Sequence, residues 1–302
     1  MLLVLSALWP VFALLVIGFF CRRYAFPGDS FWAPAEKLTY YLLFPVLLIE
    51  KLANSNWEGV PIAQLGLAVA VLLLGATSLS FLCRFFMRID GPSFTSLYQG
   101  GVRFNTYVAL AAVSALYGGG SVAISAVIIA MMIPVINVLC VVVFSANTAS
   151  NVSVTAVLGT LLKNPLIISC LVGISLNVSG LGLPNWASSV SQLLGQMALP
   201  LGLLCVGAGL SVAALKSSQS SIWAASLIKL VLSPLLVYML GTWMGFDPYL
   251  LSILLVFASV PTAPSGYILA RQLGGNAEMM SAIITMQTLF SMLSMPIILS
   301  VS

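Results

Sequence analysis

The chain contains very little charge. Of its 302 residues, 11 are Lys or Arg and 7 are Asp or Glu, together 6%, whereas hydrophobic residues make up 61%. A soluble domain of this length carries charge on roughly a quarter of its residues, so the composition excludes a soluble enzyme and a disordered scaffold. The cations are spread singly along the chain, which argues against nucleic acid as a partner. Membrane lipid must therefore surround most of the chain.

Histidine is absent and cysteine is scarce. Without histidine the chain lacks the commonest general base and metal ligand. The five cysteines form an odd set without metal-ligand spacing, as expected of small core hydrophobes. No carboxylate pair lies in the middle of an apolar run. We therefore expect no metal, no cofactor and no catalytic constellation, and an enzyme is the least favoured class.

Long apolar runs are what the sequence has in abundance. About 20 apolar residues cross a bilayer as a helix, and the runs lack the alternation of membrane barrel strands. The sequence therefore predicts an all-α integral membrane protein with ten transmembrane helices. The expected ranges are roughly 2–21, 34–53, 61–83, 94–117, 121–145, 157–178, 187–211, 220–244, 249–271 and 277–300.

The few cations predict the orientation of these helices. Arg22 and Arg23 follow the first run and no cation precedes it, the reverse of a cleaved signal peptide. With the N-terminus outside, eight cations fall on the inner side and only Lys51 falls outside, as the positive-inside rule requires. We expect a multi-pass protein of the inner (plasma) membrane with both termini on the outer side. The eight inner cations are Arg22, Arg23, Lys37, Arg84, Arg88, Lys163, Lys216 and Arg271.

The two halves of the chain resemble each other. Residues 10–18 match 165–173, and 44–49 match 199–204, both at an offset of 155. Chance agreement among apolar strings is the alternative, but shared prolines and paired glycines favour a repeat. The repeats are 1–148 and 155–302, joined by a short polar linker at 145–156. Because each holds five helices, the second enters the membrane from the opposite side, an inverted repeat typical of transporters.

The fourth helix of each half is unsuited to a regular helix. Helix 4 contains two glycines, an arginine, an asparagine and a threonine within residues 99–110. Helix 9 contains Pro261, Pro264 and Gly266, and prolines remove amide donors and free carbonyls. Irregular backbone at membrane depth is tolerated only inside protein or beside a water-filled cavity. We therefore predict two broken crossover helices that face each other at a substrate site.

The chemistry of these breaks suits a small carboxylate. Ends of half-helices present free amides and a partial positive charge, and hydroxyl and amide side chains add neutral partners. Arg103 either extends along helix 4 to the inner water, which we favour because it shares a face with Gln99, or supplies the counter-charge. For Lys229, the other intramembrane cation, we favour a structural role. The candidate substrate-binding residues are Arg103, Asn105, Thr106, Pro261, Thr262, Pro264, Ser265 and Gly266.

Two segments carry a resemblance to a known family. RFNTYVALA at 103–111 and VPTAPSGYILARQLGG at 260–275 resemble the auxin efflux carrier family, in its bacterial branch related to the plant PIN proteins. The resemblance implies two inverted repeats in a sodium/proton-antiporter-like or bile-acid-transporter-like fold, and a homodimer. It also implies an elevator movement, with helices 1, 2, 6 and 7 as scaffold and helices 3–5 and 8–10 as the transport domain.

The resemblance also assigns residues. Asn105 matches the asparagine that contacts the substrate carboxylate in plant members, and Pro261 matches their crossover proline. The chain departs from the pattern at Phe104, where the family has proline, and it lacks the long cytoplasmic loop of plant members. These departures favour a small organic acid, malate-like or malonate-like, over auxin.

The expected function is secondary transport of a small organic anion by alternating access. The absence of a buried carboxylate favours efflux or uniport. One alternative is a sodium-coupled symporter of bile-acid-like or sulfonate anions, and another is a membrane sensor that binds its ligand without moving it. We expect Asn105→Ala to abolish binding without loss of folding.

Overall fold

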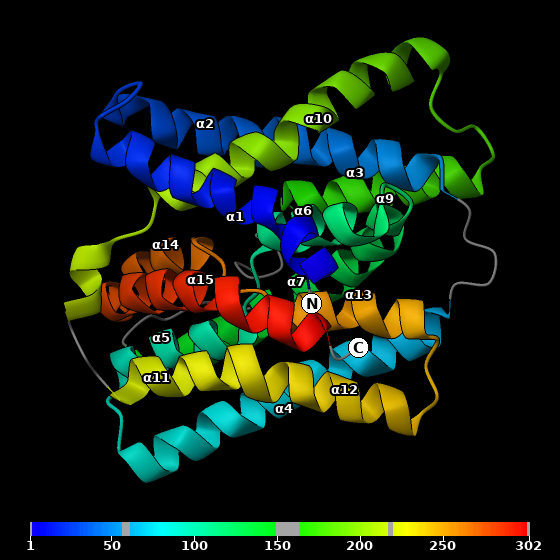
Figure 1. The fold of residues 1–302 in the computed structure, drawn as a ribbon. Helices are drawn as coiled ribbons and strands as arrows, with labels where there is room; N and C mark the ends of the chain where they lie inside the picture. Colours follow the sequence, from blue (N-terminus) through cyan, green and yellow to red (C-terminus); the bar gives the residue numbers. More distant parts are fainter. Residues whose placement is uncertain (1, 56–60, 149–162, 217–219, 301–302) are drawn as a thin grey trace.

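A computed structural model describes residues 2–55, 61–148, 163–216 and 220–300 of the chain. Within these ranges every regular element is a helix (Figure 1). In chain order they are α1 (Leu2–Arg23), η1 (Asp29–Phe31), α2 (Trp32–Leu38), η2 (Thr39–Leu43), α3 (Phe44–Ala53), α4 (Ile62–Met87), α5 (Gly91–Val102), α6 (Thr106–Tyr117), α7 (Ser121–Asn147), α9 (Pro165–Val178), α10 (Asn185–Ala208), η3 (Val212–Lys216), α11 (Ser220–Leu227), η4 (Ile228–Leu232), α12 (Ser233–Trp243), α13 (Pro248–Ser259), α14 (Ser265–Gln272) and α15 (Ala277–Leu299).

Six helical stretches are long and apolar enough to cross a membrane, so the prediction of an all-α, multi-pass membrane protein is confirmed. They are α1, α4, α7, α10, the continuous stretch Ser220–Trp243 and α15. The expected start of helix 6 at 157 and the linker beyond 148 lie outside the described residues. The ten-helix count and the inverted repeat stay predictions.

Two of the expected helices contain a π-helical turn that the sequence pattern did not indicate. The turns are η2, between α2 and α3, and η4, between α11 and α12. Each is followed within two residues by a proline, Pro45 and Pro234. Because proline has no amide hydrogen, it interrupts the regular ladder of hydrogen bonds, and a wider turn absorbs the interruption.

The helices form two groups (Figure 1). α1, α2, α3, α9 and α10 lie together at the top of Figure 1, whereas α4, α5 and α11–α15 lie below them. In the upper group α1 packs along α10 and α3 packs along α9; in the lower group α4 packs on α5 and α12. α6 packs on α1 and α10 and also on α7 and α13, and so joins the two groups.

Small residues set the contact between α1 and α10. A Cβ atom on Gly18 would meet the backbone of Leu204, and one on Gly207 would meet the backbone carbonyl of Leu15. Backbone cannot move aside as a flexible side chain can. These two glycines therefore fix how closely the two helices approach.

We predict that Gly207→Ala lowers the free energy of unfolding by about 1 to 3 kcal/mol, because an added methyl group forces the two helices apart. Thermal unfolding of the purified protein in detergent measures the effect. Gly66→Ala on α4 is the matched control: its Cβ would meet open space, so alanine should stabilise that helix by up to ~1 kcal/mol. Equal shifts in the two variants would contradict the packing argument.

Candidate functional site

The two broken helices touch at their breaks. α5 ends at Val102 and α6 begins at Thr106, while α13 ends at Ser259 and α14 begins at Ser265. The Asn105 amide donates to the Pro261 carbonyl over 2.8 Å. The Thr262 hydroxyl donates to the Gln99 carbonyl over 3.0 Å. One backbone and one side-chain hydrogen bond thus hold the two breaks together.

Gln287 of α15 joins the same two breaks. Its Oε1 accepts from the Thr262 amide over 2.9 Å, and its Nε2 donates to the Gly100 carbonyl over 3.0 Å. The side chain is fully buried. Gln287 thus forms interhelical hydrogen bonds with both breaks.

Lys229, on the π-helical turn η4, lies behind the second break. It is 1% exposed, and its Nζ donates to the Phe257 carbonyl over 3.3 Å. That carbonyl would accept from residue 261 in a regular helix, but Pro261 has no amide hydrogen. Lys229 therefore supplies the donor that the proline cannot, which agrees with the structural role favoured from the sequence.

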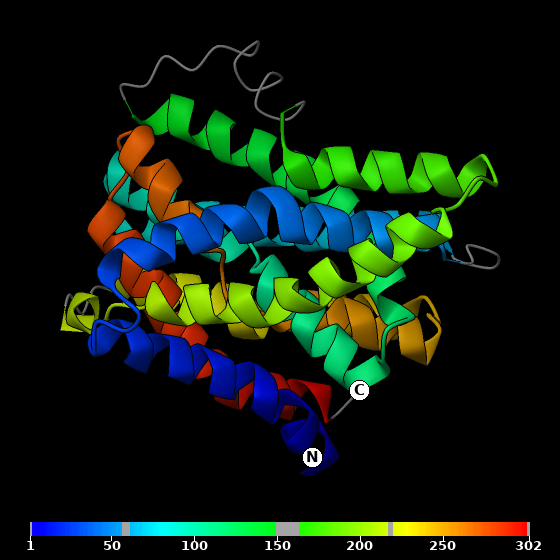
Figure 2. The same cartoon turned by 90° about the horizontal axis from the view of Figure 1, so that it is seen from above.

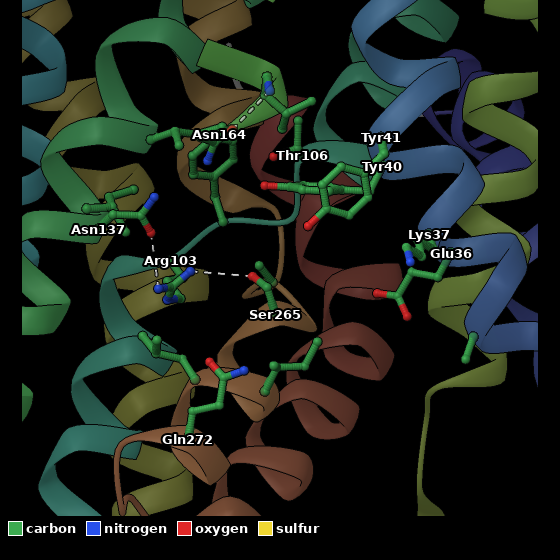
Figure 3. A pocket seen from close by; sticks show the side chains of 18 residues that line it. Glu36, Lys37, Tyr40, Tyr41, Arg103, Thr106, Asn137, Asn164, Ser265 and Gln272 are labelled. Atoms are coloured by element: carbon green, nitrogen blue, oxygen red, sulfur yellow. Dashed lines mark hydrogen bonds between the residues drawn. The ribbon is translucent and has the colours of Figure 1, made fainter. Parts of the chain in front are cut away.

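A cavity of about 530 Å³ lies beside the breaks. Its walls come from α2, η2, α7, α14, the start of α9 and the two breaks (Figure 3). The polar lining residues are Glu36, Lys37, Tyr40, Tyr41, Arg103, Thr106, Asn137, Asn164, Ser265 and Gln272.

Arg103 faces this cavity. Its guanidinium lies 3.4 Å from the Ser265 hydroxyl and 3.3 Å from the Asn137 amide oxygen (Figure 3). The residue is 8% exposed, and its Nε has no partner among the described residues. Because α5 ends just before it, the side chain turns towards α7 and α14 instead of extending along helix 4. Of the two roles left open by the sequence, this geometry fits the counter-charge.

The predicted site residues divide into two sets. Arg103, Thr106 and Ser265 line the cavity. The other five lie in or beside the breaks but outside the cavity lining: Asn105, Pro261, Thr262, Pro264 and Gly266. Direct contact of either set with a substrate stays a prediction.

Asn105 begins α6. Its Oδ1 accepts from the amides of Tyr107 and Val108, over 3.1 and 3.2 Å, which caps the helix. Its Nδ2 is buried and has no partner among the described residues. One end of the side chain thus holds the backbone, while the other is free to donate to a ligand.

Substitution of Asn105 should separate these two tasks. We predict that Asn105→Ala lowers the free energy of unfolding by about 1 kcal/mol, because the cap is lost. Asn105→Ser retains a capping oxygen and should keep most of that stability. Both variants lose the Nδ2 donor, so both should bind anions more weakly in thermal-shift titrations. Full anion binding by the serine variant would exclude Asn105 as a ligand-binding residue.

The cavity also contains residues that the sequence analysis did not single out. Glu36 and Tyr40 lie one turn apart on the α2–η2 segment, and Asn164 caps α9 through its Oδ1. A signal existed for the first pair, because their spacing of four places a carboxylate and a phenol on one helix face. Nothing local in the sequence shows that α9 begins beside them.

Broken helices in contact, a polar cavity beside them and apolar helices around them define a membrane transporter. The chain matches the family described as "Membrane transport protein" over residues 3–299 and belongs to it. This is the auxin efflux carrier family that the two quoted segments resemble, and its members are transporters, not enzymes. The chain is also similar to the Rhizobium meliloti (strain 1021) protein "Putative malonate transporter", with 30% identity over 129 residues. That match covers 42% of this chain and 40% of the relative.

Proposed function

We propose that this protein is a secondary carrier of small organic anions, in which Arg103 binds the substrate carboxylate. The observation that carries the proposal is a buried guanidinium that lines a cavity, with the neutral partners Ser265 and Asn137 and no carboxylate paired with it among the described residues. Arginine keeps its charge in any protein environment, and its planar fork matches a carboxylate. A carboxylate beside Arg103 would also lie close to the hydroxyl of Ser265.

The relative from Rhizobium meliloti supports malonate as the first substrate to test. Malonate is a small dicarboxylate, and the cavity lining contains a second cation, Lys37 on α2. A small substrate would leave room for bridging water in a cavity of about 530 Å³. The proposed substrate class is therefore small carboxylates, with malate and auxin-like acids as comparisons.

Packing supports the proposed inverted repeat. Gly18 lies against the backbone of Leu204, and Gly173 lies against Ile49. Gly173 follows Gly18 by 155 residues, and Leu204 follows Ile49 by the same offset, which is the one found in the sequence. The helix pairs follow the same relation. α1 with α10 is the expected helix 1 with helix 7, and α9 with α3 is helix 6 with helix 2, the equivalent pair of the other half.

The elevator mechanism, orientation and homodimer remain part of the proposal. The cavity lies between the two groups of helices, and the upper group comprises the expected scaffold helices 1, 2, 6 and 7. Lys37 lines the cavity and is one of the cations assigned to the inner side, which supports an opening towards the cytoplasm. The two chain ends lie near each other in both views, in keeping with termini on one side of the plasma membrane (Figures 1 and 2).

Reconstituted protein tests the proposal. We expect malonate to raise the melting temperature of the purified protein, and sealed proteoliposomes to take up labelled malonate without an imposed sodium or proton gradient. If malonate uptake required sodium, the carrier would be a sodium symporter and not a uniporter. Binding without movement across the membrane would identify a sensor, and neither binding nor movement with malonate, malate or indole acetate would exclude an organic-anion carrier.

A further inference from the structure

We propose that the carrier exchanges one anion for another faster than it releases an anion alone. The inference rests on the proposed transport function and adds its kinetic mode. It comes from the environment of Arg103, where the described residues supply hydrogen-bond partners but no negative charge.

The described residues of the protein supply no counter-charge to Arg103. Both hydrogen-bond partners of its guanidinium are neutral, and among the described residues no carboxylate lies within salt-bridge distance of it. The acidic lining residue, Glu36, comes from α2 on the opposite wall of the cavity (Figure 3). Because part of the guanidinium borders the cavity, water there can solvate that part when no anion is bound.

Alternating access requires the cavity to close around the site. Closure removes water from Arg103, and a guanidinium cannot escape that penalty by losing its proton. A bound carboxylate neutralises the charge and occupies its hydrogen-bond donors, so the loaded carrier closes readily. The empty carrier must close with an uncompensated charge, which is strongly disfavoured at membrane depth. Lys229 does not line the cavity and donates to the Phe257 carbonyl, so we expect it to affect both closures equally.

Return of the empty carrier is therefore the slow step. An anion that binds on the far side lets the carrier return loaded and so avoids this step. Proteoliposomes loaded with labelled malonate test this directly. Unlabelled malonate added outside should accelerate release of the label by about tenfold or more relative to buffer alone. Equal release in both arms would overturn the exchange mode but leave the carrier function standing. Absence of release in both arms would overturn the carrier function together with the inference.

A charge-neutral variant provides the second arm. In Arg103→Gln, tested at malonate concentrations raised to restore loading, the ratio of exchange to net release should fall towards one, because empty closure no longer buries a charge. Arg84→Gln is the matched control, since Arg84 lies outside this cavity and binds Asn147; its ratio should equal that of the unmodified protein. An undiminished ratio in Arg103→Gln would show that another group slows the empty carrier.

Discussion

Replacing Arg103 by glutamine is expected to raise the KM for malonate transport by about 10-fold to 100-fold. A hydrogen bond to a charged group contributes ~1.5 to 3 kcal/mol, and each 1.4 kcal/mol changes affinity by about tenfold. Glutamine retains an amide that can reach towards Ser265 or Asn137, but it has no charge for the carboxylate. Initial rates of uptake into proteoliposomes over a range of malonate concentrations measure the effect.

Two further variants separate charge from geometry. Arg103→Lys keeps the charge but loses the planar fork, so its KM should lie between those of the unmodified protein and Arg103→Gln. Arg84→Gln removes a guanidinium that lies 4.6 Å from the centre of the Phe94 ring, outside the cavity, and should leave KM unchanged. An unchanged KM in folded Arg103→Gln would move the carboxylate site to Asn105 and the break itself.

Much of the fold could be predicted from the sequence because its signals are local. Apolar runs gave the helices, and the prolines at 261 and 264 marked the second break, which the structure places at 260–264. The first break has no proline; glycines and polar side chains marked it within residues 99–110, and it lies at 103–105. Contact between the breaks was predicted because each lies in the fourth helix of its half of the chain.

The cavity could be predicted only in part, because its walls come from helices far apart in the sequence. Arg103, Thr106 and Ser265 were found because they adjoin the breaks. Glu36 and Asn164 were not, because their place in the cavity wall depends on how α2 and α9 pack. The direction of the Arg103 side chain could not be predicted either, because it depends on α5 ending at Val102. In a regular helix through residue 103 the side chain would point elsewhere.

The second large effect is expected at Gln287, which neither lines the cavity nor carries charge. Gln287→Leu keeps the size of the side chain but leaves the Thr262 amide and the Gly100 carbonyl without their hydrogen bonds. An unsatisfied buried polar group costs about 1 to 3 kcal/mol, so the variant should lose ~2 to 6 kcal/mol of unfolding free energy. Thermal unfolding in detergent, compared with the unmodified protein, measures the loss.

The controls for Gln287 follow from the direction of each hydrogen bond. Gln287→Glu can still accept from Thr262 but, when ionised, cannot donate to Gly100, and it introduces a buried charge, so it should also be unstable. Gln192→Leu, an exposed glutamine on α10, should leave stability within about 0.5 kcal/mol. If Gln287→Leu unfolds at the same temperature as Gln192→Leu, the two breaks do not depend on this side chain. Loss of stability only at Gln287 would show that a neutral amide on α15 fixes the two breaks relative to each other. It would thereby keep Arg103 of the first break close to Ser265 of the second.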